Sequence, residues 1–150
     1  MIAVRRANRD DLRFIVDAQM AMAVESEGAE LDLATLTEGV RAVLEDRVHA
    51  EYWLAEEDEG PVGMLMTVTE WSDWRNGAVL WIHSVYVAPE ARRRGVYSAL
   101  YAHLRDQVEH TDELVGLRLY VDKRNEPAQR VYEALGMTRD HYHLYEWLKP

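Results

Sequence analysis

The chain has 150 residues, of which 48% are hydrophobic and 29% charged, which is the size and composition of one globular domain with its own core. A formal net charge of −10 argues against general binding to nucleic acid, and the absence of cysteine excludes disulfides, thiolate metal ligands and a cysteine nucleophile. No apolar run approaches the roughly 20 residues of a membrane-spanning helix, and the N-terminal sequence lacks the apolar segment of a signal peptide, so we expect a cytoplasmic protein without a membrane partner.

The first half of the chain predicts a strand, two helices and three strands. A short strand over residues 2–7 precedes a helix that Asn8 or Asp10 can cap and that Gly28 interrupts. A second helix is predicted from near Asp32 to Leu44. Three strands follow, separated by turn-forming sequences, and the predicted ranges are 51–57, 61–71 and 78–88.

The second half returns to helical spacing. We predict a helix over residues 90–109, a strand over 114–122, a short helix capped by Asn125 and ended by Gly136, and a last strand over 141–148. The order of elements is β-α-α-β-β-β-α-β-α-β. It predicts an α/β fold with a mixed sheet, in a single domain over residues 1–150.

The negative charge is concentrated in one third of the chain. Between Glu25 and Glu59 there are 12 acidic and two basic residues, whereas the remainder is balanced. One interpretation is a solvated surface that keeps the protein dispersed in water. The other, for Glu25 and Glu27, is an electrostatic attraction for a cationic ligand.

An arginine-rich turn connects the strand that ends near Val87 to the following helix. Arg92, Arg93 and Arg94 offer forked donors that suit phosphate oxygens, and Gly95 permits close approach or an unusual dihedral angle. The start of a helix adds unpaired N–H groups and partial positive charge. A basic run is also typical of a solvated surface, so the turn alone decides nothing. It is neither a P-loop nor a dinucleotide fingerprint, because the required lysine and glycines are absent.

Together with a second motif, the turn resembles the GNAT superfamily of acyl-CoA-dependent N-acetyltransferases. The family pattern Gln/Arg-x-x-Gly-x-Gly/Ala appears as Arg92-Arg93-Arg94-Gly95-Val96-Tyr97. A downstream Asn-x-x-Ala-x-x-x-Tyr-x-x-x-Gly pattern and an apolar residue are matched by Asn125, Ala128, Tyr132, Gly136 and Met137. The predicted order of elements is similar to that fold over nearly the whole chain. Tyr97 departs from the usual Gly or Ala, and the main-chain amides can still bind the pyrophosphate there if its ring points away; the departure concerns the detailed geometry and not the resemblance itself.

The resemblance implies that acetyl-CoA is the acyl donor and that no metal is needed. Main-chain groups near Val85, Tyr86 and Val87 would pair with the pantetheine arm, much as an added strand would. The alternative for the two valines is ordinary sheet core. The remaining residues implied at the cofactor site are Arg92, Arg93, Arg94, Gly95, Val96, Tyr97, Ser98, Asn125 and Tyr132.

The implied reaction is direct attack of a neutral amine on the thioester, which requires no enzyme nucleophile. An amide near Val85 would donate to the oxygen that gains negative charge. Tyr132 would protonate the departing thiolate, although a tyrosine at this position could also serve only to pack its ring on the sheet. The candidates for the base that deprotonates the ammonium are Glu25, Glu27, Glu70, Asp73 and His83, and the catalytic set predicted from the sequence is Tyr132, Glu25 and Glu70.

An acidic and aromatic pocket is the predicted acceptor site. Its residues are Glu25, Glu27, Trp71, Asp73, His83 and Ser84. The alternative, exposed charges with aromatic residues in the core, is equally compatible with the sequence. The histidines at 141 and 143 are predicted to be surface residues rather than metal ligands.

The predicted function is therefore acetyl transfer from acetyl-CoA to a primary amine, with a small cationic amine favoured over a protein lysine. The alternatives are a non-catalytic acyl-CoA sensor or interaction module of the same fold, and the same chemistry with a longer acyl group. The sequence identifies neither the acceptor nor the oligomeric state, and it leaves a homodimer open.

Overall fold

The structure, a computed structural model, describes residues 1–150, which divide into the two compact units Met1–Leu119 and Tyr120–Pro150. The single domain over residues 1–150 stays a prediction. The elements of the first unit are β1 (Ala3–Arg6), the short 3-10 helix η1 (Arg9–Asp11), α1 (Leu12–Glu27), α2 (Leu33–Leu44), β2 (Ala50–Glu57), β3 (Gly60–Ser72), β4 (Gly77–Val87), the 3-10 turn η2 (Pro89–Ala91), α3 (Val96–His110) and β5 (Leu114–Leu119). No helix of the chain is both long enough and apolar enough to cross a membrane.

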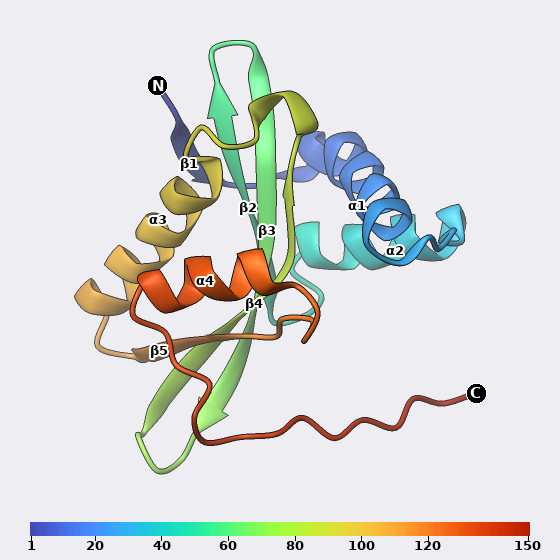
Figure 1. The fold of residues 1–150 in the computed structure, drawn as a ribbon. Helices are drawn as coiled ribbons and strands as arrows, with labels where there is room; N and C mark the ends of the chain where they lie inside the picture. Colours follow the sequence, from blue (N-terminus) through green and yellow to red (C-terminus); the bar gives the residue numbers. More distant parts are fainter. The chain divides into compact units, whose positions relative to one another are not determined.

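A five-stranded mixed sheet forms the centre of the first unit (Figure 1). The strands lie in the order β1-β2-β3-β4-β5; the first four are antiparallel and β5 runs parallel to β4. Short turns connect β2 to β3 and β3 to β4, whereas α1 and α2 lie between β1 and β2, and the parallel pair needs the crossover through α3. The mixed α/β fold predicted from the element order is confirmed.

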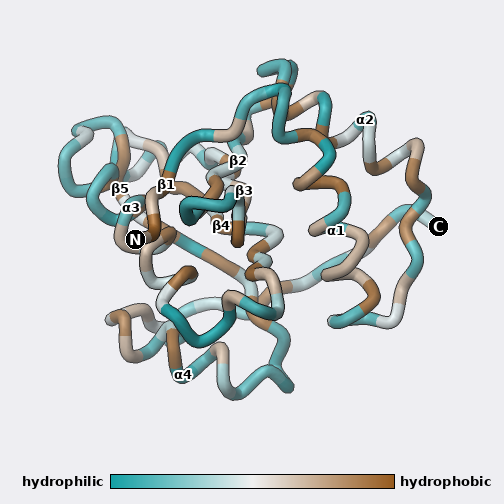
Figure 2. Tube along the Cα trace, turned by 90° about the horizontal axis from the view of Figure 1, so that it is seen from above, coloured by the Kyte–Doolittle hydropathy of each residue, from teal (hydrophilic) through white to brown (hydrophobic).

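Alternating side chains give the sheet two buried faces. Tyr52, Leu54 and Met64 pack with residues of α1 and α2 in one hydrophobic cluster. The intervening residues point to the other face, where Trp53 contacts His103 of α3 with ring centroids 5.1 Å apart. The view from above in Figure 2 shows β2, β3 and β4 between α3 on one side and α1 on the other.

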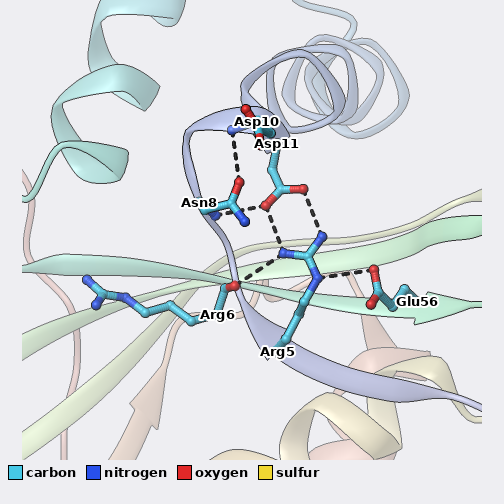
Figure 3. A network of polar contacts seen from close by, with 6 residues as sticks. All are labelled: Arg5, Arg6, Asn8, Asp10, Asp11 and Glu56. Atoms are coloured by element: carbon cyan, nitrogen blue, oxygen red, sulfur yellow. Dashed lines mark hydrogen bonds and ion pairs between the residues drawn. The ribbon is translucent and has the colours of Figure 1, made fainter.

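A partly buried ion pair fixes the start of α1 to the edge of the sheet (Figure 3). The guanidinium of Arg5 donates to both carboxylate oxygens of Asp11 at 2.9 Å, and its Nε donates to Glu56 at 3.1 Å. The Asp11 carboxylate also accepts from the Asn8 N–H at 2.8 Å. Mainly through the Arg5 hydrogen bonds, the pKa of Asp11 is held below its ordinary value. This network sets the direction in which α1 leaves β1 and therefore where the far end of α1 lies.

The helix that was predicted to begin near Glu90 begins at Val96. The residues before it form the turn η2 and then an extended and left-handed backbone, with φ angles of 65° at Arg93 and 82° at Gly95. Left-handed residues cannot belong to a right-handed helix. The prediction from hydrophobic spacing alone therefore placed the start of this helix about two turns too early.

The second unit contains one helix, α4 (Glu126–Ala134). As predicted, the Asn125 side chain caps it by accepting from the Ala128 N–H at 3.2 Å, and Gly136 follows its end with a φ of 88°. The predicted last strand over residues 141–148 is wrong, because this segment forms no strand. Alternating apolar residues favour a strand, but a strand also needs a neighbouring strand for its main-chain hydrogen bonds, and the alternation does not provide one. The histidines at 141 and 143 are exposed.

Candidate functional site

A β-bulge interrupts β4 near its C-terminal end. Met66 of β3 lies opposite His83, and Met64 lies opposite Tyr86, so the two residues between them on β4 face a single residue of β3. Ser84, the first of the two, has a φ of 53°, which is unusual for a residue other than glycine. A bulge bends its strand and re-aims the residues beyond it.

Beyond the bulge, β4 is separated from its other neighbour. The parallel pairing of β4 with β5 ends at Ile82 opposite Leu119, although β4 continues to Val87. The edge of β4 from Val85 to Val87 that faces away from β3 therefore has no strand beside it. Main-chain N–H and C=O groups along such an edge can pair with an extended ligand.

The turn that follows β4 leads directly into the N-terminus of α3. Gly95 is the N-cap residue, and its carbonyl accepts the first hydrogen bond of the helix, from the Ala99 N–H at 3.0 Å. The N–H groups before Ala99 have no acceptor within the helix, and the helix dipole adds partial positive charge there. No atom lies within 4 Å of the place where a Gly95 Cβ would be, so the space above this residue is open. The turn is thus shaped to receive an anion on main-chain donors.

The start of α3 is pressed against the sheet at a glycine of β3. A Cβ added to Gly63 would lie 2.7 Å from Cγ1 of Val96 and 3.2 Å from the main-chain oxygen of Tyr86. Val96 is buried, so its side chain has little room to move. This close contact sets the height of the helix N-terminus above the end of β4.

We expect Gly63→Ala to lower the free energy of unfolding by about 2 kcal/mol, because the added methyl group overpacks the contact with Val96. Urea unfolding measures the change. The matched control is Gly39→Ala in α2, where nothing lies within 4 Å of the added Cβ and where alanine favours the helix by up to about 1 kcal/mol. A Gly63→Ala protein as stable as the parent would contradict the close packing described here.

Two of the three arginines in the turn make ion pairs with the acidic third of the chain. Nη2 of Arg92 donates to Glu25 at the end of α1 at 2.7 Å, and Nη2 of Arg94 lies 2.9 Å from Glu57. The sequence predicted these arginines as helpers in phosphate binding, without carboxylate partners. Part of the acidic segment therefore balances the charge of the basic turn.

A cavity of about 430 Å³ lies beside the turn, between the end of α1 and the end of β4. It brings together five residues that the sequence predicted for the site, and these are Glu25, Val85, Tyr86, Val87 and Arg92. Met22 and Ser26, which also line it, were not predicted. Their only signal was helical spacing, which places Met22 one turn before Glu25. A smaller cavity of about 220 Å³ near Ala7 and Val43 contains no predicted site residue.

His83 is the titratable residue next to the bulge. Its side chain is half-buried, and the burial lowers the pKa of the imidazole below its ordinary value. Its ring is stacked with that of Trp81, with centroids 6.3 Å apart and an angle of 30° between the planes. Both side chains point to the same face of the sheet as Tyr86, because Tyr86 resumes the alternation after the bulge. At neutral pH the imidazole is uncharged and can accept a proton.

The carboxylates predicted near the acceptor have different surroundings. Glu70 of β3 accepts from Arg118 of β5 at 2.6 Å, across the intervening β4. Glu27, the last residue of α1, is exposed. Asp73 lies in the β3–β4 turn, where its carboxylate accepts from the Trp74 N–H at 2.9 Å.

The structure does not bring Asp73 and Trp71 together with Glu25. Trp71 pairs with Ala78 at the start of β4, whereas Met64 pairs with Tyr86 at its end, which is a separation of about 23 Å along the strand. Trp71 is 64% exposed. The acidic and aromatic pocket that was predicted as one site is therefore divided between the two ends of the β3–β4 hairpin.

Tyr97 lies in the first turn of α3, at the position where the family pattern has Gly or Ala. Its ring lies along the helix near that of Tyr101, with centroids 6.3 Å apart. Tyr101 is buried and Tyr97 is half-buried, so the two rings lie on one side of the helix. In the second unit, Asn125 is the N-cap residue of α4 and Tyr132, which is half-buried, lies within that helix.

An open strand edge that leads to a basic helix start is the architecture of a protein that can hold an extended ligand with an anionic end. The model of the acetyltransferase (GNAT) family matches residues 17–137, and the chain belongs to this family. The crystal structure of a possible acetyltransferase from Clostridium difficile 630 is 40% identical in sequence, with a TM-score of 0.92 over 100% of this chain and 99% of that chain. The resemblance predicted from the two motifs is confirmed.

Two further solved structures share the fold at lower identity. A probable acetyltransferase is 23% identical, with a TM-score of 0.86 over 99% of this chain and 98% of that one. A predicted acetyltransferase with acetyl-CoA from Clostridium acetobutylicum is 20% identical, with a TM-score of 0.72 over 100% and 96% of the two chains. A search among curated proteins gives no match.

Proposed function

We propose that this chain is an N-acetyltransferase that moves an acetyl group from acetyl-CoA to a primary amine, with a small cationic amine as the favoured acceptor. The observation that carries the proposal is the edge of β4, which leaves β5 at Ile82 and leads past Val85 and Val87 to the Gly95 turn. Membership of the acetyltransferase family supports it.

The residues of the turn fit the chemistry of coenzyme A. The open space above Gly95 admits a diphosphate to the amides at the start of α3, and the edge of β4 offers paired donors and acceptors to an amide-containing arm. Acetyl-CoA, when bound, supplies an acetyl group already activated as a thioester. The amide near Val85 would donate to the carbonyl oxygen as negative charge develops on it.

We assign the role of base to His83. Of the other four candidates, Glu25 and Glu70 are engaged by arginines. Glu27 is exposed at the end of α1, and Asp73 lies at the distant end of the hairpin. His83 adjoins the bulge, and its burial keeps the imidazole neutral at pH 7. It would accept the proton that the attacking amine loses while the new C–N bond forms and the C–S bond breaks.

Tyr132 is assigned as the acid that protonates the departing sulfur, on the strength of its place in the second family motif. We expect Tyr132→Phe to lower kcat about tenfold, because a thiolate leaves without much help and the acid therefore contributes less than the base. Steady-state kinetics at saturating acetyl-CoA measures the loss. A kcat within twofold of the parent value would remove Tyr132 from the mechanism.

The direct test of the function is the amine-dependent release of thiol. The purified chain is mixed with acetyl-CoA and a panel of polyamines, amino sugars, amino-acid derivatives and a lysine peptide, and free thiol is followed with a chromogenic reagent. The proposal predicts release that depends on at least one small cationic amine. Binding of acetyl-CoA without release by any amine would favour the alternative, a non-catalytic acyl-CoA sensor, and preference for the peptide would overturn the assignment of the acceptor.

A further inference from the structure

Arg92 links three parts of the site through one side chain. Its Nε donates to the main-chain oxygen of Val87 at 2.9 Å, and its Nη2 donates to Oε2 of Glu25 at 2.7 Å. Its guanidinium carbon lies 5.8 Å from the centroid of the Tyr86 ring. The end of β4 and the last turn of α1, which are far apart in the sequence, are therefore joined at the residue that opens the turn.

The position of Arg92 matters because the residues after it have an unusual backbone. Arg92 itself is extended, whereas Arg93 and Gly95 have positive φ angles. A backbone of this kind persists only where neighbouring contacts hold it in place. Arg92 anchors one end of the turn, and the hydrogen bond from Ala99 to Gly95 anchors the other.

We infer that Glu25 is a positioning residue, which acts through Arg92 to hold the Gly95 turn in the conformation that receives the cofactor, and that it is not the general base. The carboxylate of Glu25 already accepts a charged hydrogen bond, and protonating it would remove the negative charge that strengthens that bond. The inference rests on the proposed function, because it assigns the turn to acetyl-CoA.

The exposure of the pair indicates that its effect is local. The side chains of Arg92 and Glu25 are 44% and 45% exposed, and ion pairs so open to water contribute little to global stability. Loss of Glu25 should therefore leave the unfolding midpoint almost unchanged and act on the turn alone. An unchanged unfolding midpoint therefore distinguishes a positioning role of Glu25 from a general structural role.

The test compares Glu25→Ala, Glu25→Gln, Arg92→Ala and the double alanine variant with Glu30→Ala, an exposed residue between α1 and α2 that carries the same charge. We expect Glu25→Ala to raise the KM for acetyl-CoA about three- to fivefold, with kcat and its pH profile unchanged. The double variant should be no weaker than Arg92→Ala alone. Glu25→Gln should recover most of the loss, because the amide oxygen still accepts from the guanidinium, whereas glutamine cannot replace a base.

A second readout needs no ligand. In the cofactor-free protein, Glu25→Ala should shift the backbone amide resonances of Arg93 and Gly95, and Glu30→Ala should not. The inference would be overturned by any one of four results for Glu25→Ala. These are unshifted amide resonances, a lowered kcat, loss of the acidic limb of the pH profile, and a raised KM for the amine rather than for acetyl-CoA. If the parent protein binds no acetyl-CoA, both the proposed function and this inference are wrong. If the parent protein binds acetyl-CoA and the Glu25→Ala protein binds it equally well, only the inference is wrong.

Discussion

Replacement of His83 by glutamine is expected to lower kcat for amine acetylation by about 100-fold or more, which is the usual contribution of a general base. His83 adjoins the bulge of β4, and its pKa is lowered by burial, so the neutral imidazole is the dominant form at pH 7. Glutamine has a similar size and can still form hydrogen bonds, but it cannot accept the proton from the amine. Steady-state kinetics with saturating acetyl-CoA and amine measures the effect.

The pH dependence gives the same prediction a second readout. Only the neutral imidazole can act as a base, so the activity of the parent protein should fall as the pH drops through the His83 pKa, which lies below the ordinary value of about 6.5. The His83→Gln protein should lack this acidic limb. The control is His49→Gln, which replaces an exposed histidine before β2. This variant should keep the kcat of the parent protein and the acidic limb of its pH profile. A His83→Gln protein with normal kcat and an intact limb would transfer the role of base to another residue or to water.

Replacement of Gly95 by valine is expected to weaken acetyl-CoA binding about thirtyfold. Gly95 has a φ of 82°, and a β-branched residue at a positive φ costs about 2 kcal/mol. The variant turn can relieve that strain only by rotating its backbone, which moves the amides away from the positions in which they would bind the diphosphate. Binding would then have to restore the strained form, and the cost appears as a higher Kd.

The control for this variant is Gly28→Val. Gly28 ends α1 with a φ of 60°, and nothing lies within 4 Å of the Cβ added at either position, so both substitutions introduce backbone strain without a clash at Cβ. The control should lose stability but keep its affinity for acetyl-CoA. If Gly95→Val and the parent protein bind acetyl-CoA with equal affinity, the turn does not take part in cofactor binding.

Much of the fold follows from local sequence patterns. Helical and strand periodicity places nine of the ten predicted elements, and short-range chemistry predicts the Asn125 cap and the turn between β3 and β4. The failed prediction is the last strand over residues 141–148, because alternation describes the faces of a strand and not the partner it needs. Patterns within a segment are therefore predictable, whereas pairing between segments is not.

For the site, as for the fold, the sequence predicted the local motif but not the contacts between distant segments. The motif around Gly95 identified the turn, but nothing in the sequence indicated the positive φ of Ser84 or the early end of the β4–β5 pairing. The ion pair between Arg92 and Glu25 joins residues 67 positions apart, so it depends on the direction in which α1 crosses the sheet. The sequence presented Glu25 as a free carboxylate for this reason.

The most direct test of the central claim is isothermal titration calorimetry of the parent protein with acetyl-CoA, at two temperatures so that a vanishing binding enthalpy is not mistaken for lack of binding. If the β4 edge and the Gly95 turn form a coenzyme A site, binding should be one to one with a Kd between about 1 and 100 μM. Absence of binding heat at both temperatures and at millimolar ligand, in protein that circular dichroism shows to be folded, would contradict the account.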